Sequence, residues 1–481
     1  MRRHRVLILA ALAAILVAGA CSSGTGTQAT TTTPSSRSGS SSVTSSPTTS
    51  RGSPATTAGG TSAATSGSWT TYFHDAGRSG VAPDGPSTPA AVRRVWATAL
   101  DGAVYAQPLV VDDTVIAATE NDTMYAVNAA SGALLWQNHL GTPLPNSTLA
   151  CGDVDPVGIT GTPVADPDAN RVFAVGLVAP GKDILYELNL ATGVLVASTD
   201  VDPPGSSYTT DNQRAALALD GNEVLVPFGG RYGDCGSYHG RVTAVPVAAA
   251  GLGTPSYFTL PTENEGGFWA PPGAVVAPDG SFYLASGNSS STGSYDYGNA
   301  VVHLSAGLQL LDSFAPTDFA RLNASDTDLG STNPVLDGSV IFQVGKSGIG
   351  YLLNAGHLGG VGGQLSSAQV CTDLAMGGVS HSGATLFVPC PSGLVGVSIA
   401  GNQIRVLWTA PADTAGPAIV TPSAVWTVAT GAGQLLAVDP ADGHVVFRQS
   451  IGTVPSRFVS PAAGSGRVVI AASGQVMAFG D

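Results

Sequence analysis

Short apolar runs separated by turn residues recur along most of this chain. The clearest unit, residues 105–137, reads YAQPLVVDDTVIAATENDTMYAVNAASGALLWQ. It contains four runs of strand length: the second follows a turn at Asp112-Asp113, and the fourth follows a turn that carries Ser131-Gly132. Four short antiparallel strands make one blade of a β-propeller. The pattern therefore predicts a propeller blade at this position.

The same order of runs and turns returns along residues 69–481. Eight third strands can be aligned on one apolar position, which is Val127, Leu188, Val245, Leu304, Leu353, Val397, Val438 or Phe479. The last two spacings are 41 residues each, which matches a bare four-stranded blade of roughly 40 residues. The longer spacings in the first half indicate inserted loops. The sequence thus predicts an all-β protein with an eight-bladed propeller.

The two ends of the repeat region complement each other. The last unit stops at Asp481, directly after its third strand, and therefore lacks a fourth. Upstream of the first blade, residues 92–98 resemble a fourth strand without the first three. We expect the segment around Trp96 to complete the last blade and close the ring, because closure removes open strand edges.

Composition agrees with this fold and narrows the function. The chain has 62 Gly and 32 Pro, and only 11% of its residues are charged, which suits short strands joined by tight turns. The 33 acids outnumber the 19 bases, giving a net charge of −14. No run of Lys or Arg follows the first five residues, so the basic patch of a nucleic-acid-binding protein is absent from the sequence.

The N-terminus has the features of an export signal. Arg2, Arg3 and Arg5 precede an apolar stretch at 6–18 that is too short for a membrane span. A cysteine, Cys21, follows this stretch in the sequence VAGAC. We predict a lipoprotein signal peptide at 1–20 with acylation of Cys21; the alternative is an ordinary secretory signal cut after Ala20.

The next segment, residues 21–68, consists almost entirely of Ser, Thr, Gly, Ala and Pro, with Arg37 and Arg51 as its only charges. Such a segment cannot bury a core, so it is predicted to be a disordered tether. Together with Cys21, it predicts an exported protein anchored by lipid on the outer side of the cytoplasmic membrane.

Four cysteines remain after Cys21. In an oxidising compartment, an even number favours two disulfides. Three pairings exist, and we favour Cys371–Cys390, which are close in sequence and leave Cys151–Cys235 as the second pair. A structural zinc site is not expected, because the sequence lacks close cysteine pairs and clustered histidines.

The repeat YAVNAASGALLW and the opening segment WTTYFHDAGRSG resemble those of PQQ-like, or quinoprotein-like, propellers. That family also includes the scaffold lipoprotein of outer-membrane protein assembly. The resemblance covers nearly all of residues 69–481. It implies the fold, but it leaves the function open, because this fold carries enzymes, scaffolds and sensors.

Quinoprotein alcohol dehydrogenases of this family stack a quinone between a tryptophan and a disulfide of adjacent cysteines, and bind calcium beside an aspartate base. The resemblance implies that Asn288 is a calcium ligand and that Asp326 or Asp328 is the catalytic base. Trp269 is the nearest candidate for the stacking residue. These matches make PQQ and calcium the candidate cofactors.

Two parts of that site have no match. The glutamate ligand of calcium falls near Cys235, where Asp234 is the adjacent acid, and the sequence has no pair of adjacent cysteines. One Asn and one Asp are few oxygen ligands for calcium, which takes six to eight. The quinone site is therefore predicted to be incomplete.

The remaining polar candidates each have a structural alternative. His239 binds a ligand or satisfies a nearby carbonyl, and Gln213-Arg214 either point to the central channel or pair with a blade loop. Trp269 forms a ligand platform or caps the core, and aromatic burial favours the core. Lys346 lies in a turn between glycines, and no helix follows it as a phosphate-binding loop would require.

We therefore expect a monomeric, non-catalytic binding or scaffold module at the cell surface, with a protein or polymer of the cell envelope as its partner. A calcium- and quinone-dependent oxidoreductase is one alternative. A binder of envelope carbohydrate or polymer is the other. No GxSxG element or other hydrolase spacing supports a third class of enzyme.

Overall fold

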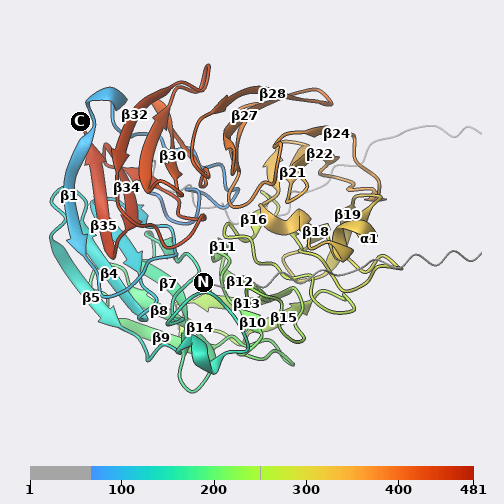
Figure 1. Cartoon of the computed structure of the whole chain (residues 1–481). Helices are drawn as coiled ribbons and strands as arrows, with labels where there is room; N and C mark the ends of the chain where they lie inside the picture. Colours follow the sequence, from blue (N-terminus) through green and yellow to red (C-terminus); the bar gives the residue numbers. More distant parts are fainter. Residues whose placement is uncertain (1–66, 250) are drawn as a thin grey trace, which may run out of the picture. The chain divides into compact units, whose positions relative to one another are not determined.

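The computed structural model describes residues 67–249 and 251–481. The predicted signal peptide, Cys21 and nearly all of the predicted tether lie outside the described residues. Within the described part, eight sheets are arranged around a ring (Figure 1), which confirms the eight-bladed propeller. No helix in residues 67–249 and 251–481 is long and apolar enough to cross a membrane.

The first four blades contain the inserted loops that the spacing predicted. Blade 1 is β2 (Leu109–Val111), β3 (Thr114–Ala118), β4 (Thr123–Asn128) and β5 (Leu134–His139). Blade 2 is β6 (Val164–Asp166), β7 (Arg171–Val178), β8 (Lys182–Asn189) and β9 (Leu195–Asp200). Blade 3 is β10 (Asp211–Asn212), β11 (Ala218–Asp220), β12 (Glu223–Gly230), β13 (Arg241–Ala248), β14 (Gly251–Leu252) and β15 (Ser256–Thr259). Blade 4 is β16 (Val275–Val276), β17 (Phe282–Ala285), β18 (Val301–Leu304) and β19 (Leu310–Ala315), with β23 (Gly360–Val361) added in parallel.

The last four blades are more regular. Blade 5 is β20 (Val335–Asp337), β21 (Val340–Val344), β22 (Ile349–Asn354) and β24 (Ser366–Gln369). Blade 6 is β25 (Ser380–Ser382), β26 (Thr385–Cys390), β27 (Gly393–Ala400) and β28 (Gln403–Ala410), and blade 7 is β29 (Ile419–Thr421), β30 (Ala424–Ala429), β31 (Gln434–Val438) and β32 (Val445–Ser450). Blade 8 is β33 (Ala462–Gly464), β34 (Arg467–Ala472), β35 (Gln475–Gly480) and β1 (Arg93–Ala99). The short helices are α1 (Phe319–Ala324), η1 (Pro89–Ala91), η2 (Asn146–Thr148) and η3 (Leu329–Ser331).

Ring closure follows the predicted pairing. Strand β1 pairs antiparallel with β35, with Arg93 opposite Gly480 and Ala99 opposite Gln475. The chain therefore supplies the outer strand of blade 8 before it builds blade 1. All eight aligned residues lie in the third main strands of their blades, so the predicted repeat is confirmed.

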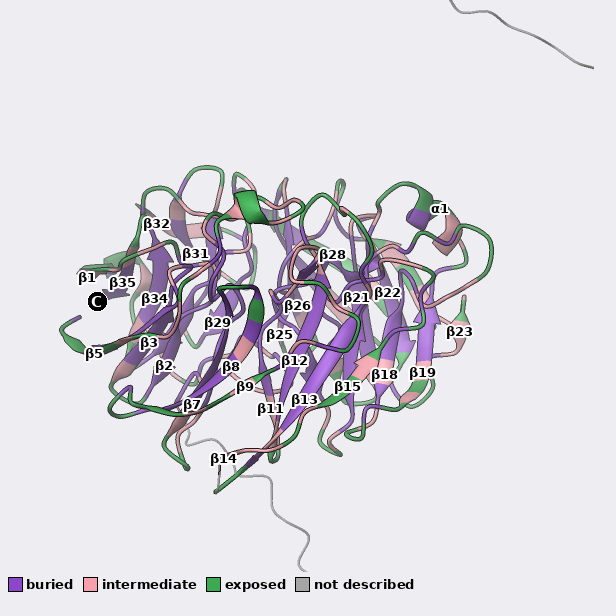
Figure 2. Ribbon diagram, turned by 90° about the horizontal axis from the view of Figure 1, so that it is seen from below, coloured by how far each residue is buried: buried purple, intermediate pink, exposed green. Residues whose placement is uncertain are grey.

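Tryptophans of the outer strands join neighbouring blades. The indole Nε1 of Trp96 donates to the Ala129 carbonyl of blade 1 at 2.8 Å, and that of Trp136 donates to the Leu190 carbonyl of blade 2 at 3.0 Å. Each ring packs on a turn glycine: a Cβ at Gly193 would lie 2.4 Å from the Trp136 ring. Figure 2 shows the buried inner strands and the exposed turns at both faces.

The segment 68–82 crosses the propeller axis. Its backbone hydrogen-bonds to Val110 in blade 1, Ala165 in blade 2, Val276 in blade 4 and Val420 in blade 7. These four residues belong to the innermost strands of blades on opposite sides of the ring. The segment therefore links the inner strands directly, in addition to the contacts between adjacent blades.

Arg78 is the charged centre of this axial segment. It is 0% exposed, and its guanidinium donates to the carbonyls of Ala274 and Leu217, which precede the inner strands of blades 4 and 3. It also donates to Thr71 Oγ1 and the Tyr72 carbonyl. Burial lowers its pKa to about 10, so the side chain stays charged at neutral pH.

Both predicted disulfides are present. Cys151 is bonded to Cys235, with 6.1 Å between their Cα atoms, and Cys371 is bonded to Cys390, with 5.9 Å between theirs. The first bond ties the loop between blades 1 and 2 to the β12–β13 loop of blade 3. The second lies between blades 5 and 6, because Cys371 follows β24 and Cys390 ends β26.

Replacing Arg78 with methionine should destabilise the propeller by at least about 3 kcal/mol, because several buried acceptors lose their donors together and each unpaired one costs about 1–3 kcal/mol. The exposed Arg405 on β28 provides the control, and Arg405→Met should change the free energy of unfolding by no more than about 0.5 kcal/mol. Urea unfolding of both variants measures the difference. Equal effects would show that the axial segment does not hold the blades together.

Candidate functional site

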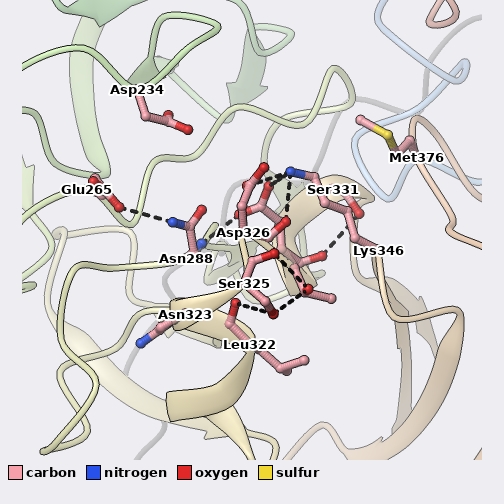
Figure 3. Close-up of polar contacts among 12 residues, drawn as sticks. Asp234, Glu265, Asn288, Leu322, Asn323, Ser325, Asp326, Ser331, Lys346 and Met376 are labelled. Carbon is pink, nitrogen blue, oxygen red and sulfur yellow. Dashed lines mark hydrogen bonds and ion pairs between the residues drawn. The ribbon is translucent and has the colours of Figure 1, made fainter. Parts of the chain in front are cut away.

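A polar cluster gathers at the axis from loops of blades 3 to 5 (Figure 3). Glu265 and Trp269 lie between β15 and β16, Asn288 follows β17, and Asp328 lies between α1 and β20. Lys346 occupies the β21–β22 turn. The structure thus brings together four residues that were predicted separately from the sequence: Trp269, Asn288, Asp328 and Lys346.

Asp328 is the most buried member of this cluster, at 3% exposure. Its Oδ1 accepts a hydrogen bond of 2.7 Å from the backbone N–H of Asn288, and its Oδ2 lies 2.6 Å from Lys346 Nζ. Burial raises the pKa of Asp328, while the Lys346 ammonium and the two hydrogen bonds oppose that rise. Both oxygens of this carboxylate already have a partner.

The Lys346 ammonium also has a partner for each of its N–H donors. In addition to Asp328, its ammonium contacts Asp326 Oδ1 at 2.7 Å and the Asp326 carbonyl at 3.2 Å. These three acceptors match its three N–H donors. Burial alone would lower the Lys346 pKa, but the two carboxylates raise it above its usual value. Its Nζ also lies 5.8 Å from the centre of the Trp269 ring, within the range of a cation–π contact.

Glu265 belongs to the cluster but was not named from the sequence. Its Oε2 accepts a hydrogen bond of 3.0 Å from Asn288 Nδ2. Burial and the nearby charges of Asp234 and Asp328 raise its pKa. Its backbone forms bridges to His239 and Ser289, which fix its place between two loops. The only signal in the sequence was its position four residues before Trp269.

The expectation that Trp269 caps the core is wrong. Its side chain is partly exposed, and its ring meets the edge of Phe458 at a centroid distance of 6.2 Å and an interplanar angle of 72°. The indole lies at the axis, where loops of different blades meet, and not between two sheets. The apolar cap expected here is instead supplied by the neighbouring Phe268, which is 1% exposed.

The other candidates divide into structural and accessible residues. Gln213 is buried, and its Nε2 donates to the Ala215 carbonyl at 2.7 Å, so it supports its own loop. His239 is partly exposed and contacts Thr262 Oγ1 at 3.0 Å, a hydroxyl and not the carbonyl expected. Arg214 is partly exposed and lies 4.1 Å from the centre of the Phe458 ring.

A second set of acids is buried near the start of blade 2. Asp122, in the β3–β4 turn, is 0% exposed, and neither of its oxygens has a hydrogen-bond partner among the described residues. Burial, followed by the charges of Glu120 and Asp183, raises its pKa to about 8. The neighbouring Glu120 accepts from the Gly158 N–H at 2.8 Å and from Thr160 at 3.0 Å, and burial raises its pKa to about 7.

Comparison with known proteins identifies the repeat in part of the chain. Residues 88–226 match the family model described as outer membrane protein assembly factor BamB. The chain is an eight-bladed β-propeller that carries this PQQ-like repeat over those residues. No curated protein matches it in sequence.

Solved PQQ-like propellers share its fold at low identity. A quinohemoprotein alcohol dehydrogenase from Pseudomonas putida has a TM-score of 0.68 and 15% identity, covering 86% of this chain and 80% of that one. A europium-containing methanol dehydrogenase has a TM-score of 0.63 and 14% identity, covering 85% and 90%. BamB from Moraxella catarrhalis has a TM-score of 0.56 and 11% identity, covering 81% and 99%. Enzymes and an assembly factor thus share the fold, so the fold alone does not assign a role to this propeller.

The calcium site implied by the resemblance does not fit the observed contacts. Asp328 has both oxygens engaged, one of them by the Lys346 ammonium, so of this pair only the amide oxygen of Asn288 is left for a cation that takes six to eight oxygen ligands. Within residues 67–249 and 251–481, the one group of three His, Cys, Asp or Glu ligand atoms within 4.8 Å of each other is Cys371, Asp373 and Cys390. Its two cysteines are bonded to each other and are not free to bind a metal.

The quinone stack implied by the resemblance is also incomplete. Trp269 offers one aromatic face, but its neighbours at the axis are Phe458 and Lys346. The Cys151–Cys235 bond joins loops 84 residues apart in sequence and is not the bond of adjacent cysteines that the family uses. We therefore derive no reaction step through a quinone or a metal.

The chain has two lysines, which give a matched test of the cluster. Lys346→Met should cost about 3–5 kcal/mol, because it leaves Asp328 charged and buried without a counter-charge. Lys182→Met should cost no more than about 1 kcal/mol, because the Lys182 side chain is 49% exposed. Urea unfolding at neutral pH measures both losses, and the Lys346→Met loss should shrink in acid as Asp328 becomes protonated. Equal losses in the two variants would contradict this account of the ion pair.

Asp122 should make the protein less stable as the pH rises. Its pKa in the folded state is about 8, above the usual value for aspartate, so the folded form holds a proton that the unfolded chain releases. Stability should therefore fall between about pH 4 and pH 8, by at most about 1.4 kcal/mol per pH unit from this group.

Asp122→Asn removes the titration and should raise the unfolding midpoint near pH 8 while changing it little near pH 4.5. Urea unfolding at both pH values provides the measurement. An equal change at the two pH values would mean that Asp122 does not titrate in this range.

Proposed function

We propose that this protein is a binding module of the cell surface, exported and held by lipid on Cys21, with its ligand site at the Trp269 end of the axis. The observation that carries this proposal is the partly exposed Trp269 ring, which lies beside a fixed set of polar groups. Glu265, Asn288 and Asp328 are held by mutual hydrogen bonds. A rigid aromatic face with pre-oriented polar neighbours is typical of a ligand site.

A polymer or protein of the cell envelope suits this site as ligand. The carboxylates of Glu265 and Asp326 can accept hydrogen bonds from hydroxyl, amide or ammonium groups. The Trp269 ring can pack against the apolar face of a sugar or of another ring. Asp328 and Lys346 neutralise each other, so they position the site and leave little net charge at its base.

A calcium- and quinone-dependent alcohol dehydrogenase is the second candidate function. It is favoured by one observation, the convergence of Trp269, Asn288 and Asp328 at the same end of the axis. It is opposed by the contacts of Asp328, whose two oxygens are engaged by Asn288 and Lys346, and by the lack of an adjacent cysteine pair in the sequence. For this reason we place it after the binding module.

Calorimetric titration of the purified protein distinguishes the two functions. Fragments of cell-envelope polysaccharide should bind, and Trp269→Ala should weaken binding at least about tenfold, a loss of 1.4 kcal/mol. Tyr257→Ala is the control, because Tyr257 is an exposed aromatic on the outer strand β15 and is 40% exposed. This control should bind like the wild type.

The same protein is then titrated with PQQ in the presence of calcium and assayed for dye-coupled alcohol oxidation. Saturable PQQ binding together with alcohol oxidation would support the dehydrogenase function and overturn the proposal of a binding module. Failure of every envelope fragment to bind, or equal binding by Trp269→Ala and wild type, would overturn the proposal.

A further inference from the structure

The outer strands of blades 6, 7 and 8 carry exposed arginines that have no ion-pair partner. None of the ion pairs within residues 67–249 and 251–481 includes these four side chains, which are Arg405 on β28, Arg448 on β32, and Arg93 and Arg94 on β1. The acceptors that they do reach are neutral: Arg448 donates to Gln434 Oε1 at 2.7 Å, and Arg94 lies 3.9 Å from the Met477 sulfur. Their positive charges are therefore available to a partner.

The local charge of these blades is opposite in sign to that of the whole chain. Residues 380–481 together with β1 contain six arginines against four aspartates, a net charge of +2, whereas the chain has −14. β28, β32 and β1 contain no Asp or Glu; Asp442 lies in the turn before β32, and Asp481 follows β35. The exposed cations of β8 and α1, Lys182 and Arg321, are paired with aspartates. An anionic partner is thus attracted to the side of blades 6 to 8 and repelled by the rest.

Large apolar side chains are exposed next to these arginines. Val95 on β1 is 42% exposed, and Val406 and Leu407 on β28 are 39% and 46% exposed. On β32, residues 445–447 are partly exposed and precede Arg448. We refer to the exposed arginines and apolar side chains of β28, β32 and β1 as the arginine rim. Apolar groups exposed in such a cluster are typical of an interaction surface.

The three strands follow one another along one side of the ring (Figure 1). They are the outermost strands of consecutive blades. The Trp408 indole on β28 donates to the Pro440 carbonyl in the turn before β32 at 3.1 Å, which joins blade 6 to blade 7. The short helix η1, which directly precedes β1, packs against β32. The arginine rim is therefore one continuous stretch of the outer wall.

We propose that the arginine rim rests on the anionic surface of a lipid bilayer. Guanidinium groups pair with the phosphates of lipid head groups through two parallel hydrogen bonds. Each cation near such a surface strengthens binding about fivefold. The exposed apolar side chains enter the boundary between head groups and acyl chains. A soluble acidic polymer would pair with the arginines but leave those apolar side chains in water, so the bilayer is the favoured partner.

The lipid on Cys21 would assist this contact, and in that respect the inference rests on the proposed function. A Gly/Ser-rich linker as long as residues 21–66 has an end-to-end distance of about 35–40 Å. Such a tether raises the effective concentration of the rim at the bilayer, so a weak contact is sufficient. Because the rim is the side wall of the ring, this contact leaves the Trp269 end of the axis open to ligands.

Vesicle flotation tests the rim without any acyl chain. The protein is the mature chain, residues 21–481 with Cys21→Ala, and the vesicles contain phosphatidylcholine alone or mixed with phosphatidylglycerol. At about 0.1 M salt, where the Debye length is about 10 Å, the chain should partition at least about tenfold more strongly into the anionic vesicles. At about 1 M salt, where the Debye length is about 3 Å, most of this preference should disappear.

Two double variants compare arginines of the rim with cations elsewhere. Arg94→Gln with Arg448→Gln should lower partitioning into the anionic vesicles at least about tenfold. Lys182→Gln with Arg321→Gln removes the same charge from other parts of the ring and should lower it no more than about twofold. Thermal melting of each variant confirms that it is folded.

A second comparison tests the apolar part of the rim. Val406→Ser with Leu407→Ser should lower partitioning about fivefold, because two apolar side chains no longer enter the acyl boundary. Leu311→Ser is the control, since Leu311 is 53% exposed on β19 of blade 4, outside the rim. This control should partition like the wild type.

Equal partitioning into the two kinds of vesicle, or equal losses in rim and control variants, would overturn the proposal. So would binding to soluble polyphosphate as tight as that to the anionic vesicles together with no effect of the two serine substitutions, because the rim would then bind a soluble polyanion. If the vesicles bind as expected but no envelope fragment does, the rim stands and the proposed ligand site fails. If the fragments bind and Trp269→Ala weakens them but the vesicles do not bind, the proposed function stands without this inference.

Discussion

Closure of the ring by β1 is the constraint on which the rest of the molecule depends. A propeller blade buries its faces against two neighbours, so a ring with one incomplete blade would expose both a sheet edge and the faces beside it. The pairing of β1 with β35 fills that position with a strand from the other end of the folded region. Trp96 on the same strand then bonds to blade 1, so one strand both completes blade 8 and fixes it to its neighbour.

The axial segment adds a second set of long-range connections. It begins just before β1 in the chain, and Arg78 ties the loops that enter blades 3 and 4 to it. Gln107 extends this link: its Oε1 accepts from the indole of Trp69, and its Nε2 donates to the Pro461 carbonyl ahead of blade 8. The inner ends of the blades are therefore held by polar contacts, while their faces are held by apolar packing.

The cations at the axis differ in the contacts that they make. Lys346 is surrounded by acceptors, and its ammonium keeps Asp328 charged in a buried position. Arg78 directs its donors at four protein acceptors and supports the blades. Arg214 lies at the same axis, where its guanidinium stacks on the Phe458 ring. The two cations with several bonded donors hold loops of different blades together.

The sequence alone predicted the main strands of each blade, the number of blades and the closing strand, and it favoured the observed cysteine pairing over two others. The strands and blades are predictable because every blade buries the same alternating positions and so repeats the same short apolar runs. The acidic net charge, with no run of Lys or Arg after the first five residues, predicts that the protein does not bind nucleic acid. The resemblance also assigned Asn288, one of Asp326 and Asp328, and Trp269 to one site.

Only the tertiary structure decided what those residues contact. The repeat gave no signal for Glu265, yet its carboxylate accepts a hydrogen bond from the amide of Asn288. Trp269 was expected in the core, yet its ring is partly exposed at the axis. Arg214 and Phe458 are far apart in sequence and meet only because blade 3 faces the junction of blades 7 and 8 across the ring. The pattern of hydrophobic residues predicts which side of a strand is buried. It contains no information about which loops of distant blades meet at the axis, and the candidate site consists of those loops.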